Sequence, residues 1–189
     1  MTINYYQQNA DEFFNGTINV DMSNIYQHFT KDLPAGSLIL DAGCGSGRDS
    51  KAFLCMGYKV DAFDASLEMV KRASKYTVLD VKHAAFNDVT AIDKYDAIWC
   101  CASLLHVPED DLPSTLATAL KPNGIWYVSF KYGDSQREKD GRSFTDINEQ
   151  RLTELVSSLS NIDISSTWIT EDDRPDRNEK WLNAILVKH

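Results

Sequence analysis

The chain has 189 residues, of which 43% are hydrophobic and 25% are charged, a composition that is ordinary for a globular protein of one domain. Its 19 basic and 28 acidic residues give a net charge of −9 with no basic run, so we expect no nucleic-acid partner and no membrane partner, because binding phosphates requires clustered lysine and arginine. The first residues have neither the basic nor the apolar region of a signal peptide, and no apolar run approaches the about 18–20 residues of a membrane span, so we expect a cytoplasmic protein.

Apolar periodicity and turn residues predict an alternation of helices and strands. In chain order these are helices at 3–15 and 20–33, strand 37–40, helix 49–56, strand 58–63, helix 66–76, strand 77–83, strand 95–103, helix 110–120, strand 125–131, a polar excursion at 132–145, helix 148–159, and strands 162–170 and 181–188. We expect one domain, in which residues 1–34 form a helical cap and residues 35–189 form the core.

Strands that alternate with helices predict a parallel, doubly wound sheet, and two final strands joined only by a loop must pair antiparallel. The predicted fold is therefore α/β and Rossmann-like, a seven-stranded, mostly parallel sheet with an antiparallel C-terminal hairpin and helices on both faces. In such sheets ligands bind beyond the carboxyl ends of the strands, where the topology reverses. A glycine-rich turn follows the first strand and lies at that edge.

The turn reads Asp41-Ala42-Gly43-Cys44-Gly45-Ser46-Gly47-Arg48. A dinucleotide fingerprint would need a third glycine where Arg48 stands, and a phosphate-binding loop would need Gly-Lys-Ser/Thr after its last glycine. The Asp41 carboxylate would repel a pyrophosphate but suits a ligand with an ammonium group. S-adenosylmethionine has an ammonium and a sulfonium and no phosphate, so it is the expected cofactor.

A second carboxylate, Asp64, closes the second strand. It can accept hydrogen bonds from both hydroxyls of a ribose. The alternative is that Asp64 caps the following helix, although Ser66 is a good N-cap for it already.

The four cysteines are Cys44, Cys55, Cys100 and Cys101. None forms a Cys-x-x-Cys pair, and an adjacent pair is a poor disulfide framework, so we expect reduced thiols and no metal. A zinc site that combines cysteines with histidines is the alternative.

Five segments resemble the motifs of the class I methyltransferases: "LILDAGCGSGRD", "VDAFDAS", "AFNDV", "YDAIWCCASLLHVP" and "LKPNGIWYVSF". The resemblance covers about residues 20 to 131 and continues more loosely through "GRSFTDINEQRL" and "WLNAILVKH". Within the class the chain looks similar to small bacterial tellurite-resistance methyltransferases of the TehB type.

The resemblance implies a role for each matching position around S-adenosylmethionine. Asp41 would hold the methionine ammonium, Gly43, Cys44, Gly45 and Gly47 would supply backbone contacts, Asp64 would take the ribose, Ala65, Ser66 and Met69 would line the adenine, Phe86, Asn87 and Asp88 would close over the adenine edge, and Cys101, Ala102 and Ser103 would lie beside the reactive methyl.

Methyl transfer is an in-line displacement in which the sulfonium is already a good leaving group, so no catalytic triad is expected. His106, just past the fourth strand, is the candidate base, and the alternative is a histidine that only packs at the mouth of the pocket. Tyr5 and Tyr6 are candidates to cover the cofactor and face the acceptor, or else they are core residues of a packing helix. An anionic acceptor could bind Lys131, Tyr132, Arg142 and Arg174, for which the alternative is a solvated surface.

These features together predict an enzyme that methylates a small molecule, because the loops are too short to form a second, macromolecule-binding domain. Two alternatives stay open. One is a non-catalytic module that binds S-adenosylmethionine. The other is a nicotinamide-dependent oxidoreductase, which Arg48 and Asp41 in the turn disfavour.

Overall fold

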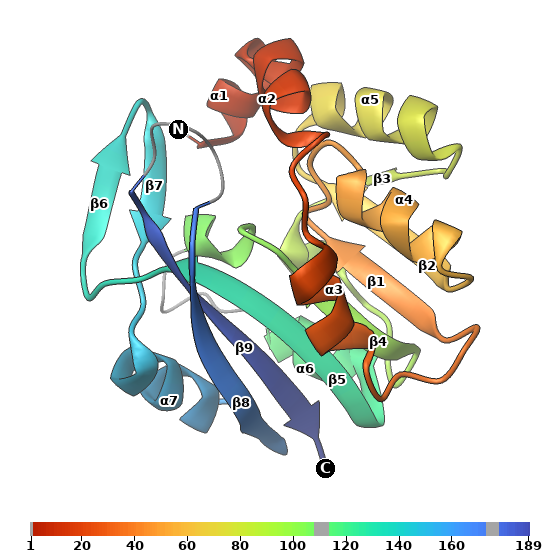
Figure 1. Ribbon diagram of the computed structural model, residues 1–189, viewed down its shortest axis with the longest axis vertical. Coiled ribbons are helices and arrows are strands. Elements are labelled where there is room, and N and C mark those ends of the chain that lie inside the picture. The colour runs from red at the N-terminus through yellow and green to blue at the C-terminus, as the bar shows by residue number, and fades with distance from the viewer. Residues whose placement is uncertain (1, 108–113, 173–177) are drawn as a thin grey trace.

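The structure, a computed structural model, describes residues 2–107, 114–172 and 178–189 (Figure 1). Its main sheet has seven strands in the order β3-β2-β1-β4-β5-β9-β8. They are β1 (Leu38–Ala42), β2 (Lys59–Asp64), β3 (Lys82–His83), β4 (Tyr95–Cys100), β5 (Leu120–Lys131), β8 (Ile162–Glu171) and β9 (Lys180–Lys188). The first five pair parallel, whereas β9 runs antiparallel to both β5 and β8. The predicted fold is confirmed.

Residues alternate between the two faces of the sheet, as the period of a strand requires. Ile39, Trp99 and Tyr127 pack on one face against helices α3 (Ser23–Thr30), α4 (Arg48–Cys55) and α5 (Leu67–Thr77). Their neighbours Leu40 and Ile98 pack on the other face, with helices α6 (Ser114–Ala119) and α7 (Glu149–Ser157). Both faces are therefore buried, which explains why the strands read as nearly continuous apolar runs.

The N-terminal segment divides into two parts with different roles. Helix α3 belongs to the core, since Phe29 is 1% exposed and packs against Trp99 and Phe53. Helices α1 (Thr2–Gln8) and α2 (Ala10–Thr17) lie instead at one end of the molecule, the end that also carries the small hairpin of β6 (Gln136–Lys139) and β7 (Arg142–Thr145) (Figure 1). These two helices replace the single helix predicted at 3–15, because the chain breaks at Asn9, which leaves helical geometry.

Several predicted boundaries were wrong for local reasons. Strand β3 has two residues instead of seven, because Val78 adopts a left-handed conformation at the end of α5 and turns the chain away. Strand β5 begins at Leu120, so the segment predicted to close a helix is strand, with a register shift opposite Tyr95 and Ala97. Residues 110–113 of the predicted helix at 110–120 lie outside the described residues.

The polar excursion contains a second, two-stranded sheet of β6 (Gln136–Lys139) and β7 (Arg142–Thr145). Asp140 and Gly141 form its turn with φ of 53° and 73°, a conformation for which Asp-Gly is well suited. Its strands are mostly polar, so their apolar alternation is weak and the hairpin was not predicted.

Candidate functional site

The glycine-rich turn between β1 and α4 is held closely against the loop that follows β4. Gly43 has φ of 77°, and a Cβ there would lie 2.6 Å from Cβ of Ser103. The Ser103 hydroxyl donates to the Ala42 carbonyl at 2.8 Å. A glycine is therefore required at position 43 both by the backbone conformation and by the approach of Ser103.

Asp64 ties the end of β2 to this turn. Its Oδ2 accepts the Gly45 amide at 2.9 Å and its Oδ1 accepts the Ser66 amide at 2.8 Å. Burial raises the pKa of Asp64, although these two backbone hydrogen bonds oppose the rise. The N-cap of α5 is Ser66, whose hydroxyl accepts the Met69 amide, so capping does not account for Asp64.

A cavity of about 1520 Å³ opens above this edge of the sheet, between the glycine turn, the loop after β4, α1 and the β6–β7 hairpin. Typical ligand pockets measure about 300–1,000 Å³, so there is room here for a cofactor and an acceptor together. Sixteen predicted site residues line it: Tyr6, Gly43, Cys44, Gly45, Asp64, Ala65, Ser66, Met69, Phe86, Asn87, Cys101, Ala102, Ser103, His106, Lys131 and Arg142.

Five predicted site residues do not line the cavity, and Arg174 lies outside the described residues. Asp41 is 2% exposed beneath the turn, where its Oδ2 accepts the Ser50 hydroxyl at 2.5 Å, and burial followed by the nearby Asp49 raises its pKa. Gly47 packs against Thr77 and Ala73 of α5. The remaining three contact other protein groups: Asp88 accepts the Ala85 amide, Tyr132 donates to Glu149, and Tyr5 stacks on Arg142.

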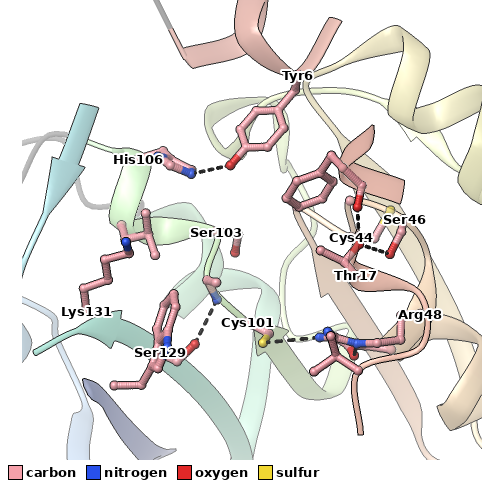
Figure 2. Close-up of a pocket in the computed structure, with 18 of the residues that line it drawn as sticks. Tyr6, Thr17, Cys44, Ser46, Arg48, Cys101, Ser103, His106, Ser129 and Lys131 are labelled. Atoms are coloured by element: carbon pink, nitrogen blue, oxygen red, sulfur yellow. Dashed lines mark hydrogen bonds and ion pairs between the residues drawn. The ribbon is translucent and has the colours of Figure 1, made fainter. Parts of the chain in front are cut away.

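His106 lies at the cavity mouth in the short helix η2 (Leu104–His106). The hydrogen-bond partners of its two ring nitrogens define which nitrogen carries the hydrogen. Its Nδ1 is 2.7 Å from the Ser143 carbonyl, which can only accept, so Nδ1 carries the hydrogen. The other nitrogen, Nε2, then accepts the Tyr6 hydroxyl at 2.8 Å (Figure 2). Burial lowers the pKa of His106 to about 4, with added repulsion from Arg142 and Lys131, so the ring is neutral at pH 7.

Arg48 is a cavity residue that the sequence interpretation used only as a departure from a glycine pattern. Figure 2 shows it pointing across the cavity floor toward Cys101, whose Sγ is 3.8 Å from Nη2. Asp49 holds the guanidinium through two bonds of 2.7 and 3.0 Å and also accepts from Tyr26 and Trp99. Burial alone would raise the pKa of Asp49, but Arg48 and these donors lower it below its usual range.

Gln7 is a second residue that sequence reasoning missed. Its Oε1 accepts the Ser66 hydroxyl at 2.7 Å and the Glu68 amide at 2.8 Å, so a side chain of α1 binds the first turn of α5. No local sequence pattern marks such a contact, because its partners lie about sixty residues away.

Two further features bear on the predicted chemistry. Within the described ranges no three His, Cys, Asp or Glu side chains are grouped so that they could hold a metal ion. Cys44 and Cys100 are buried and free, and burial is the largest reason that the pKa of both thiols is raised, which disfavours the nucleophilic thiolate.

Among the residues that the structure describes, no helix has both the length and the apolar character needed to span a membrane.

Residues 39–124 match the family model for a methyltransferase domain. A ubiquinone biosynthesis O-methyltransferase from Xanthomonas axonopodis pv. citri is 33% identical over 104 residues, which cover 51% of this chain and 44% of that relative. Residues 39–124 are therefore similar to a methyltransferase domain, the class that the sequence motifs indicated. The predicted class agrees with both matches.

Solved structures resemble the fold of this chain over almost its whole length. A Burkholderia thailandensis 1,6-didemethyltoxoflavin-N1-methyltransferase, solved with 1,6-didemethyltoxoflavin and S-adenosylhomocysteine, has a TM-score of 0.79 at 20% identity and covers 98% of this chain and 84% of its own. The [4+2]-cyclase SpnF has a TM-score of 0.76 at 14% identity and covers 98% and 94%. The chain spans less than half the length of the curated relatives that it matches.

Proposed function

We propose that this protein transfers a methyl group from S-adenosylmethionine to a small-molecule acceptor, and that both bind in the cavity above the glycine turn. The observation that carries the proposal is the link between Gly45 and Asp64. The Gly45 amide, which a pyrophosphate would need, is bound to a carboxylate at 2.9 Å. Each oxygen of Asp64 accepts one amide and keeps a second lone pair, so a ribose diol can still bind.

The chain offers a suitable partner for each part of the cofactor. Asp64 would take the ribose hydroxyls, and the adenine would lie among Ala65, Met69, Phe86 and Asn87. Arg48, fixed by Asp49, is the cation that would hold the methionine carboxylate. The ammonium of the methionine would lie against the backbone carbonyl groups of the turn. The buried Asp41 would stabilise it indirectly, through Gly43 or a water.

The cofactor supplies an electrophilic methyl group, so the protein has to bind, orient and exclude water. The reactive end would lie beside Cys101, Ala102 and Ser103. Ala102 has a left-handed φ of 51°, and its amide donates to the Ser129 hydroxyl at 2.8 Å, which keeps this loop in a strained but defined position. His106 is on the same side and would receive a proton from the acceptor if one is released.

Helix α1 and the start of α2 would act as the lid of this site. Gln7 and Asp11 bind α5, the latter through a 2.8 Å ion pair with Arg72, while Thr2 accepts the Ser143 amide of the hairpin at 3.0 Å. The segment therefore bridges the two sides of the cavity. We expect hydrogen exchange in residues 1–20 to slow when cofactor and acceptor bind, and equal exchange with and without ligands would remove the lid from the proposal.

The name of the Xanthomonas relative favours oxygen as the acceptor atom, and nothing so far favours the tellurite-resistance subgroup over other small-molecule enzymes. The lack of a nucleic-acid partner stays a prediction that rests on the net charge of −9, and the cytoplasmic location stays a prediction that rests on the first residues and the cysteine spacing. A non-catalytic cofactor-binding module is the second candidate, since the cyclase neighbour has this fold without being named a methyltransferase.

Turnover separates these candidates. The purified protein should contain S-adenosylmethionine or S-adenosylhomocysteine by mass spectrometry, and a screen of metabolites should find compounds that cause release of S-adenosylhomocysteine. Bound cofactor without release for any compound would favour the binding module, whereas a bound nicotinamide cofactor would contradict both.

A further inference from the structure

The side of the cavity away from the glycine turn has an unusual composition, which we call the hairpin wall: Lys131, Arg142, Phe144, Glu179 and Trp181. In Figure 2 Lys131 and His106 lie on this side, across the cavity from Arg48 and Cys44. Two cationic side chains of the wall lie against one aromatic ring, although the net charge of the whole chain is −9. Nζ of Lys131 is 4.7 Å from the centre of the Phe144 ring, and the Arg142 guanidinium is 5.2 Å from the same centre.

The two cations of the wall differ in how far their charge is neutralised. Glu179 binds Lys131 at 2.5 Å, with side chains 26% and 8% exposed. Arg142 is only 15% exposed, yet its one ion pair among the described residues is a 3.5 Å contact with Asp140, which is 61% exposed. Its buried Nε has no hydrogen-bond partner in that part of the chain. An almost buried guanidinium with an unused donor favours a ligand that carries negative charge.

The group that now occupies this position is itself a phenol. Tyr6 places its hydroxyl on Nε2 of His106, its ring lies edge-on to Tyr5 and Phe13, and the Arg142 guanidinium interacts with that hydroxyl. Because α1 carries Tyr6 and forms the lid, a movement of α1 would free Nε2 without disturbing the bond from Nδ1 to Ser143.

On the basis of the proposed function, we propose that the methyl acceptor is a flat phenol or enol whose hydroxyl takes the place of the Tyr6 hydroxyl, donating to Nε2 of His106 while its oxygen accepts from Arg142, with its ring against Phe144. The chemistry of the site selects against other acceptors. Arg142 and Lys131 repel a protonated amine, and a neutral imidazole with a lowered pKa is too weak a base for an aliphatic alcohol.

The step balances with the groups present. The acceptor hydroxyl gives its proton to Nε2 of His106, and the acceptor oxygen forms a bond to the methyl carbon. The carbon–sulfur bond breaks with its electron pair on sulfur, so a sulfonium and an oxyanion become a thioether and a methyl ether. The proton on His106 leaves to water.

Three probes that share one ring test the acceptor class: 4-nitrophenol, 4-nitroaniline and 4-nitrobenzyl alcohol. Each is titrated optically into the protein saturated with S-adenosylhomocysteine. We expect 4-nitrophenol to bind best, because it alone offers an acidic hydroxyl that can donate to Nε2 of His106 while its oxygen accepts from Arg142. Arg142→Gln should weaken its binding at least about tenfold, the loss expected for a charged hydrogen bond.

Lys71→Gln is the matched control, since it removes a positive charge from a side chain of α5 that is 60% exposed and lies outside the cavity lining. It should change binding of 4-nitrophenol less than threefold, and affinity for S-adenosylhomocysteine should be normal in both variants. Failure of 4-nitrophenol to bind, equal binding of the aniline or the alcohol, or equal effects of the two variants would contradict the inference. Failure of S-adenosylhomocysteine itself to bind would overturn the proposed function instead.

Discussion

The Tyr6 hydroxyl donates to Nε2 of His106 across 2.8 Å, a bond that joins the first helix of the chain to the loop after β4. It makes the cavity mouth a contact between two segments a hundred residues apart in the sequence. Because Ser143 holds the other ring nitrogen, His106 has its remaining lone pair directed at whatever group replaces Tyr6.

His106 should titrate far from its ordinary range. Burial lowers its pKa to about 4, so between about pH 4 and 6.5 the folded protein binds fewer protons than the unfolded chain. The stability that depends on neutral His106 is therefore complete above pH 6.5 and is lost as the pH falls toward 4. Proton NMR of the ring should show a midpoint near pH 4, and a midpoint near 6.5 would contradict this burial.

His106→Gln should affect turnover more than cofactor binding. General base catalysis contributes about a hundredfold or more, so we expect at least about a tenfold loss in kcat with affinity for S-adenosylhomocysteine unchanged. A lower melting temperature with normal kcat would mean that the histidine only packs the cavity mouth.

Asp64→Asn should weaken binding of S-adenosylhomocysteine by about 1.5–3 kcal/mol, because hydrogen bonds to a charged acceptor are lost. The fold should survive, since the amide oxygen can still accept one of the two backbone amides. Asp61→Asn, on the same strand but in a surface pair with Lys94, is the control and should leave calorimetric affinity unchanged. Equal affinities for both variants would make Asp64 a purely structural residue.

Gly43→Ala should be much more destabilising than Gly141→Ala. Both glycines have similar φ, 77° and 73°, but a Cβ at position 43 would collide with Ser103 at 2.6 Å, whereas position 141 has nothing within 4 Å. We expect a loss of about 1–2 kcal/mol at position 141 from the left-handed backbone alone. Position 43 should lose a further 1–3 kcal/mol, roughly, from overpacking. Urea unfolding measures both, and equal losses would show that Ser103 does not press on the turn.

Arg48→Gln should lower affinity for S-adenosylmethionine at least about tenfold, as expected when a charged hydrogen bond to a carboxylate is lost. Decarboxylated S-adenosylmethionine serves as the control ligand, because it keeps the ammonium and lacks the carboxylate. Its calorimetric affinity should be unchanged by the substitution. If both ligands lose affinity equally, Arg48 acts by keeping the buried Asp49 neutralised and not by binding the carboxylate.

The sequence was sufficient for features that depend on neighbouring residues. Apolar runs such as residues 37–40 predicted the sheet, the alternating glycines predicted the turn after β1, and Ser66 was correctly identified as a helix cap. The polar β6–β7 hairpin lacked an apolar alternation that could have revealed it.

Contacts between distant segments could not be predicted in the same way. Tyr6 meets His106, Gln7 caps α5, and Glu179 neutralises Lys131 only because the fold brings their elements to one edge of the sheet. Arg48 and Asp49 are adjacent in sequence, but only the buried position of Trp99 and Tyr26 around them shows that the pair is a fixed structural unit.

Calorimetric titration of the wild-type protein with S-adenosylhomocysteine and with NAD tests the central claim most directly. Because the Asp64 carboxylate occupies the Gly45 amide and would repel a pyrophosphate there, S-adenosylhomocysteine should bind with one-to-one stoichiometry and NAD should give no heat of binding at the same concentration. Binding of NAD with no response to S-adenosylhomocysteine would contradict the account.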